Sequence, residues 1–535
     1  MATNATILGE EVWTGAGASA TFIPETSVYL GEDCTLSSDG LTLTIDDTIQ
    51  GYCDLVPDLY VGCEASVFKT SRADVRIISN TATTLVFSED VTALVTGTAA
   101  DGNTTTTDVI AHIKPYGAPC PANDEGSSLT GTGHLLSDNW LGLVTSFSPP
   151  SLEVEVAQMN LALGGTRNYT YQYKKGSTVT GMSMDVDLNH GAWLYYALGK
   201  IKSLEASADT AIGTDTNYDD FARLTHNSEN IYRVVNGNAY PSPAGTASDG
   251  ILSGTETAYT ALDEMGTTAL EYEFEERNSG ILPSFAVEIT YNKDETVGTF
   301  VGDDGSSDTR TNAPFRDVYS RVVTGVQVNT LTLNFDEGSP LTCSLDLVAR
   351  RIFDAPSGYA PRRGQTHDLE KLTNFNSNEI MNRPYMFSDG EIKLYGQTFG
   401  KIKSGSLAIN NNLTAQRYIG NYKKDMISGH IGGQRTYDLN FTMQVTDTQL
   451  WENLKADGEH LGASTEITIK FAKTSETEGN ENDFIEIKLR DFITQSLDFP
   501  FPDDKGPVDV ALTLSARTLH SCKYKGTWHI INQDH

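Results

Sequence analysis

The chain has 535 residues with 71 acidic and 38 basic side chains, so its formal net charge at pH 7 is −33. This surplus of negative charge excludes a surface built to grip the phosphates of nucleic acids. No run of 18 apolar residues occurs, and the N-terminus lacks the basic and apolar segments of a secretory signal. We therefore expect neither a membrane span nor export.

An N-terminal arm, residues 1–26, is predicted to precede an extra β-rich module, residues 27–136. Apolar and polar residues alternate at 41–45 and 74–78, which is the period of half-buried strands, so a small sandwich is expected. Without an export signal the chain should fold in a reducing cytosol, where free thiols are the rule. The module contains four of the six cysteines, Cys34, Cys53, Cys63 and Cys120.

A second unit is predicted at residues 137–355, with an insertion at 204–263 that is rich in Asp, Thr, Ser, Gly and Asn. Residues 182–188 alternate as a half-buried strand. Asn189 is the expected N-cap of a following helix, because its short side chain can accept a hydrogen bond from the first turn. The apolar stripe of that helix comprises Trp193, Leu194, Ala197 and Leu198.

After a turn-rich linker, residues 356–390, a third unit at 391–535 shows the same order of elements. Residues 437–445 alternate as a strand, and Thr446 is the expected N-cap of a second helix. The apolar stripe of this helix comprises Leu450, Trp451 and Leu454.

Two hairpins match between the second and third units. The segments 326–350 and 492–517 each contain an alternating strand, an acidic turn and a second alternating strand that ends in Ala-Arg. Upstream, the segment 169–175 matches 418–424 in its two Tyr and two Lys residues. The sequence therefore predicts a tandem duplication.

The predicted fold class is mainly β. We expect two tandem β-sandwich or barrel units, each with one flanking α-helix, and the extra N-terminal module. Two similar units in one chain can occupy alternate positions of a ring, so three chains would form a pseudo-sixfold ring. A two-domain monomer, in which the units pack only on each other, remains the alternative.

Several segments, in this order, resemble the major tail tube proteins of long-tailed viruses of bacteria and archaea. The resemblance covers residues 141–203 and 264–535. The segments are ILPSFAVEI at 281–289, VTGVQVNTLTLNF at 323–335, SLDLVAR at 344–350, GSLAINNNLTAQRYIGN at 405–421 and VTDTQLWENL at 445–454.

The resemblance implies a β-sandwich or barrel with one flanking helix, and rings that stack into a hollow tube. Some members carry the unit twice and assemble as homotrimers, and the duplication resembles that subgroup. Hairpins at 174–181 and 423–436 would then reach the neighbouring subunit or ring. The expected assembly contacts are Tyr173, Lys174, Lys175, Tyr422, Lys423 and Lys424, with ordinary hairpin solubility as the alternative.

The same resemblance implies a virion tail location, with assembly in the host cytoplasm, and tape-measure, tail-terminator and distal tail proteins as partners. Viral DNA would pass through the lumen without specific binding. Arg362 and Arg363 of the linker would pair with carboxylates of a neighbour, unless the linker is simply solvated. The extra module would decorate the tube surface or seal adjacent rings. Acidity would suit the lumen, or serve solubility alone.

The sequence contains no catalytic fingerprint: G-x-S-x-G, H-E-x-x-H and a Walker A loop are all absent. No cofactor or metal is expected, and the acidic stretch 215–226 lacks the Gly and Glu of a calcium loop. Two other functions stay open. One is a glycan-binding or adhesive β-protein, and the other is a polysaccharide-degrading enzyme that uses two of the many carboxylates.

Overall fold

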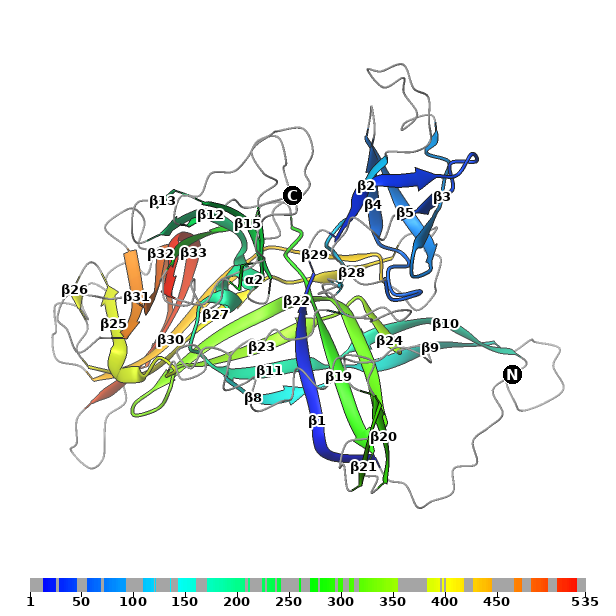
Figure 1. Ribbon diagram of the computed structural model, residues 1–535. Helices are drawn as coiled ribbons and strands as arrows, with labels where there is room; N and C mark the ends of the chain where they lie inside the picture. Colours follow the sequence, from blue (N-terminus) through cyan, green and yellow to red (C-terminus); the bar gives the residue numbers. More distant parts are fainter. Residues whose placement is uncertain are drawn as a thin grey trace.

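The computed structural model describes most of the chain (Figure 1). The described residues are 13–25, 28–45, 55–68, 72–92, 109–119, 121, 135, 143–159, 171–206, 210–211, 224–226, 229–235, 238–241, 259–260, 270–277, 280–293, 297–301, 307–311, 317–354, 383–394, 397–398, 401–417, 427–444, 466–473, 483–498 and 508–526.

Strands dominate, which confirms the predicted mainly β class. The first half contains β1 (Trp13–Pro24), β2 (Val28–Leu36), β3 (Thr42–Thr44), β4 (Glu64–Phe68), β5 (Arg72–Asn80), β6 (Thr84–Phe87), β7 (Val109–Ile113), β8 (Leu143–Ser148), β9 (Ser151–Met159), β10 (Tyr171–Thr180), β11 (Met182–Asp187), α2 (Ala192–Leu198), β12 (Gly199–Ala206), β13 (Thr210–Ala211), β14 (Leu224–His226), β15 (Glu229–Val235), β16 (Asn238–Pro241) and β17 (Tyr259–Thr260).

The second half contains β18 (Leu270–Glu276), β19 (Phe285–Lys293), β20 (Val297–Val301), β21 (Ser307–Thr311), β22 (Asp317–Asp336), β23 (Thr342–Val348), β24 (Arg351–Asp354), a 3-10 turn η1 (Phe387–Asp389), β25 (Gly390–Leu394), β26 (Gln397–Thr398), β27 (Ile402–Asn410), β28 (Thr414–Gln416), β29 (Gly429–Ile431), β30 (Thr436–Gln444), β31 (Glu466–Lys473), β32 (Asp483–Asp498) and β33 (Asp509–Gly526).

The main sheet contains eight neighbouring strands in the order β8–β11–β23–β22–β27–β30–β33–β32. All of these neighbours are antiparallel. The first four strands come from the second predicted unit and the last four from the third. The C-terminal half of β22 joins the two sets, because it pairs with β27 in register from Thr330 opposite Asn410 to Asp336 opposite Ser404.

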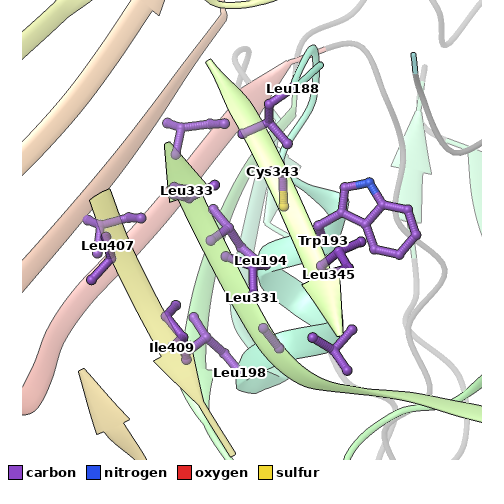
Figure 2. Packing of buried hydrophobic residues seen from close by; sticks show 14 of the residues in the cluster. Leu188, Trp193, Leu194, Leu198, Leu331, Leu333, Cys343, Leu345, Leu407 and Ile409 are labelled. Atoms are coloured by element: carbon purple, nitrogen blue, oxygen red, sulfur yellow. The ribbon is translucent and has the colours of Figure 1, made fainter. Parts of the chain in front are cut away.

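One face of this sheet is buried. Leu331 and Leu333 of β22 meet Leu345 of β23 and Leu407 and Ile409 of β27 in a single apolar core (Figure 2). The alternation predicted from sequence explains this, since successive side chains of a strand point to opposite faces. Each such fully buried aliphatic side chain contributes about 1.5–3 kcal/mol.

The short helix α2 covers part of this core (Figure 2). It begins at Ala192, not directly after the predicted N-cap Asn189, and its N-cap is Gly191. His190 Nδ1 accepts a hydrogen bond from the backbone N–H of Ala192 at 3.2 Å. The first turn of the helix therefore donates to an imidazole nitrogen and not to the predicted side-chain oxygen of Asn189. All seven helix residues are buried, so the helix has no solvent-facing side. The second predicted helix, with Thr446 and Trp451, lies outside the described residues.

The N-terminal module differs from the predicted sandwich. Its strands close into a barrel in the order β2–β3–β6–β5–β4–β7, because β2 pairs with both β3 and β7. Its core excludes solvent and also takes in Ala286, Val322 and Phe353 from the body of the chain. Cys34 and Cys63 are buried free thiols, as expected, whereas Cys53 and Cys120 lie outside the described residues. Among the described residues no helix is long and apolar enough to cross a membrane.

The predicted insertion coincides with additional strands. β12 pairs with β18, which pairs with the end of β33, and β14–β15–β16–β17 form a separate small sheet.

A polar joint lies between the barrel and the body. Glu25, fully buried, accepts hydrogen bonds from the backbone N–H of Gly117 at 2.8 Å and of Gly325 at 2.7 Å, and from the Ser284 hydroxyl. The Arg350 guanidinium donates to the carbonyls of Gly62 and Tyr116 in the barrel. Tyr116 also contacts His430 Nδ1 at 3.3 Å.

A buried ion pair ties the two units together. Lys473 of β31 donates to Asp483 at 2.8 Å and to the carbonyl of Asn189 at 2.9 Å, and it lies over the Tyr385 ring. Burial lowers the pKa of Lys473, although Asp483 acts in the opposite direction.

We predict that Lys473→Ala lowers the free energy of unfolding by about 3–5 kcal/mol, because it leaves a largely buried carboxylate without its cation. The matched control is Lys488→Ala, whose pair with Glu486 is more exposed and should cost at most about 1 kcal/mol. Urea denaturation followed by circular dichroism measures both. Equal losses in the two variants would contradict a special role for Lys473.

A second prediction concerns pH. Burial raises the pKa of Glu25 from 4.5 to about 7 and lowers the pKa of His430 from 6.5 to about 4. The contribution of Glu25 to stability is complete below pH 4.5 and is lost as the pH rises through 7. The contribution of His430 is present above pH 6.5 and is lost as the pH falls through 4. The pH dependences of the two groups therefore offset each other in the wild type.

Relative to wild type, the free energy of unfolding of Glu25→Ala should rise by about 1.4 kcal/mol per pH unit between pH 4.5 and 7. Relative to wild type, the free energy of unfolding of His430→Gln should fall by a similar amount per pH unit between pH 4 and 6.5. Urea denaturation at four pH values checks both slopes, with His520→Gln, at an exposed position, as the control. Curves parallel to wild type would refute the assignment.

Candidate functional site

The face of the main sheet opposite to the core is covered mainly by short polar side chains. Three rows of directly opposed residues cross it from β11, the first as far as β30 and the other two as far as β33. The rows are Ser183, Asp346, Thr330, Asn410 and Thr436; Asp185, Ser344, Thr332, Ala408, Asp438 and Ser515; and Asp187, Thr342, Asn334, Ser406, Asn440 and Thr513.

None of these seventeen residues is Lys or Arg, four are Asp, and none is buried. Several are hydrogen-bonded to one another: Thr513 Oγ1 donates to Asn440 Oδ1 at 2.9 Å, and Thr330 Oγ1 donates to Asn410 Oδ1 at 3.4 Å. Such a face offers no cation to a phosphate and repels it through separated carboxylates. The described residues also contain no cluster of His, Cys, Asp and Glu that could hold a metal ion.

The sheet ends in two open edges. Within the described part of the chain, β8 pairs only with β11, and the C-terminal half of β32 pairs only with β33. Val144 on β8 and Ile493 on β32 are apolar and more than two-fifths exposed. Exposed edges of this kind are templates for pairing with another chain.

A long two-stranded hairpin, β9 and β10, extends beyond the sheet (Figure 1). Leu152, Val154 and Val156 line one face of β9, and Tyr171 and Tyr173 of β10 belong to the opposite face. All five are 43–57% exposed. A hairpin that exposes five apolar or aromatic side chains on its two faces is suited to contact a partner. At its base Arg417 donates to Glu155 at 2.8 Å.

The predicted contact residues fall partly in this hairpin. Tyr173 and Lys174 are exposed on β10, and Lys175 follows them in the same strand. Tyr422, Lys423, Lys424, Arg362 and Arg363 lie outside the described residues. Sequence reasoning missed Leu152, Val154 and Val156, although their alternation with Ser151, Glu153 and Glu155 was a usable strand signal.

A model of the phage tail tube protein family matches residues 160–517, which is more than half of the chain. The chain belongs to this family. The match begins before β10 and ends at Arg517 in β33, so it covers most strands of the main sheet and leaves out β8 and the N-terminal barrel. No curated protein matches the sequence. The tail tube protein therefore has a structural role in a phage tail and is located in the virion.

We predict that Thr332→Lys with Asn440→Lys leaves the free energy of unfolding of the tail tube protein within about 0.5 kcal/mol of wild type, because both positions face solvent. The neighbouring pair Leu331→Lys with Leu439→Lys should prevent folding, because it buries two unpaired charges. Urea denaturation separates the two. The polar-face variant should also gain affinity for duplex DNA at low salt, measured by fluorescence anisotropy. Similar destabilisation of both variants would show that the face is assigned wrongly.

Proposed function

We propose that three copies of this chain form a ring of six tube units, and that stacked rings form the hollow tail tube through which viral DNA is delivered. The observation that carries the proposal is the order of the main sheet. The set β8–β11–β23–β22 and the set β27–β30–β33–β32 follow each other head to tail. Such a contact is heterologous, so its repetition between chains forms a ring when the rotation from one unit to the next closes.

The equivalence of the two sets supports a tandem duplication. β22 and β32 each carry a bulge at the corresponding place, between Val328 and Thr330 and between Thr494 and Ser496. β8 and β27 also each carry a bulge at the corresponding place along β11 and β30. Bulges are specific local features of a strand, so agreement at both places favours a common origin for the two units.

Ring closure follows from the same equivalence. The open edge of β32 corresponds to the edge of β22 that pairs with β27, and the open edge of β8 corresponds to the edge of β27 that pairs with β22. We therefore infer that β32 of one chain pairs with the β8 edge of the next. Ser496 of β32 corresponds to Thr330 of β22, and Leu152 corresponds to Asn410 of β27. Because Thr330 lies opposite Asn410, the same register would place Ser496 opposite Leu152 of the neighbour. The Pro residues at 149 and 150 would limit the length of this ladder and restrain pairing before assembly.

The size of the lumen favours three chains. A closed sheet of n strands spaced by about 4.8 Å and tilted by about 40° has a backbone radius of about 24 Å for twenty-four strands and about 16 Å for sixteen. Side chains narrow both further. Three chains of eight strands leave room for a hydrated duplex, whereas two chains leave little.

The polar face would line this lumen. Its hydroxyl and amide groups interact with water, and its separated carboxylates repel phosphates, so DNA slides without being held. In this arrangement the net charge of −33 is compatible with the conduction of DNA, because the lumen needs to repel phosphates and not to bind them. The β9–β10 hairpin, with Tyr173, Lys174 and Lys175, would contact the next ring, where its exposed apolar residues lose contact with water. Tyr422, Lys423 and Lys424 would serve the corresponding hairpin of the second unit.

The remaining roles follow from the family alone. Tape-measure, tail-terminator and distal tail proteins would be partners, and assembly would take place in the host cytoplasm. A structural family argues against the polysaccharide-degrading alternative, and the rows of short side chains on the polar face contain no aromatic residue that would support the glycan-binding one.

The test is a cross-link between chains. The variant Leu152→Cys with Ser496→Cys should yield covalent dimers and trimers on non-reducing gels, because opposed residues of antiparallel strands have the Cα separation of a disulfide. Negative-stain microscopy of the same sample should show rings or hollow rods.

The matched internal control is Thr330→Cys with Asn410→Cys, which should form only an intrachain link. Ser148→Cys with Ser496→Cys, four residues out of register, should not cross-link efficiently. Rings without the interchain link would refute the register, and a monomer under every assembly condition, including high salt, would refute the ring.

A further inference from the structure

The polar joint at the barrel has a counterpart in the second tube unit. Arg350 follows the end of β23 and Arg517 lies within β33 at the corresponding place, each after Ala, and Gly325 and Asp491 occupy corresponding places in β22 and β32. Both places have a left-handed backbone, with φ of 65° at Gly325 and 55° at Asp491. The two sites therefore share a backbone and differ in their side chains.

In the second unit the pair is local. The Arg517 guanidinium donates to Asp491 Oδ2, with an Nε–Oδ2 distance of 3.0 Å. The Arg517 side chain is 73% exposed, and the Asp491 side chain is 11% exposed. This site is a surface ion pair.

In the first unit the aspartate is replaced by Gly325. A Cβ there would lie 2.5 Å from Arg350 Cβ, so the present position of Arg350 requires glycine. Glu25, from the segment that enters the barrel, supplies a carboxylate instead and accepts from the Gly325 N–H. Arg350 is buried, and it donates to Gly62 and Tyr116 of the barrel and to the carbonyl of Ile427 near β29.

We propose that the exchange of an aspartate for Gly325, together with Glu25, converts a surface ion pair into a lock that docks the N-terminal barrel permanently on the first tube unit. Arg350 is the positioning residue of this lock. The second unit has the local Arg517–Asp491 pair in place of this lock, so each chain displays one barrel. In the proposed ring, on which this last step rests, three barrels alternate with three bare units around the outside.

Several contacts fit a permanent dock better than a flexible tether. Phe353 and Val322 of the tube unit are buried in the same apolar core as the barrel strands. Arg351 donates to the carbonyls of Asp58 and Leu59, also in the barrel. The barrel therefore meets the body through a continuous buried surface with a charged centre.

The decisive variant is Gly325→Asp, which restores the local pair. Hydrogen exchange measured by mass spectrometry should become at least tenfold faster in residues 58–63 and 115–119, while β30 and β33 keep their wild-type protection. Glu25→Ala and Arg350→Ala should give the same pattern by removing the other two parts of the lock. Asp491→Gly, the mirror change in the second unit, should leave the barrel unaffected.

Wild-type exchange at 58–63 and 115–119 in all three lock variants would overturn the proposal. Since the measurement needs only the folded chain, it stands whether or not rings form. In assembled rings, three outer lobes are expected for the wild type and blurred lobes for Gly325→Asp. Six lobes, or none in the wild type, would refute the alternation.

Discussion

The antiparallel pairing of β22 with β27 is the contact on which the rest of the molecule depends. It joins two four-stranded sets into one sheet and aligns their apolar residues, so that Leu331, Leu333, Leu407 and Ile409 share one core. Because each set repeats the same order of strands, the pairing also leaves one open edge at each end. Within the described residues the sheet is therefore not closed by itself, and the proposed ring is the arrangement in which both edges find partners.

Alternation of side chains gives this sheet two unlike faces. The buried face is dense with Leu, Ile, Phe and Met, and the other is limited to Ser, Thr, Asn, Ala and Asp across the opposed rows. Long cations are excluded from those rows, although the chain has 38 of them. The location of charge, and not only its total, therefore favours a lumen over a merely soluble surface.

The two four-stranded sets differ where the barrel attaches. Arg517 lies at the surface beside Asp491, whereas Arg350 packs against Gly325 and is buried among barrel carbonyls, and Glu25 accepts a hydrogen bond from the Gly325 N–H. Buried ionisable groups cost free energy unless they are hydrogen-bonded, and here each carboxylate oxygen and several guanidinium nitrogens have partners.

Local patterns in the sequence determined the mainly β class, the strands at 182–187 and 436–444, the correspondence of the two hairpins and the acidity of the chain. These features depend on neighbours a few residues apart, so they are readable without the fold. The start of α2 two residues later than expected, the closed barrel in place of a sandwich, and the burial of Glu25 depend on contacts between distant segments. Glu25 and Gly325 are 300 positions apart, and only tertiary structure decides which edges stay open and which side chains meet, because burial and strand pairing are set by partners that the local sequence does not encode.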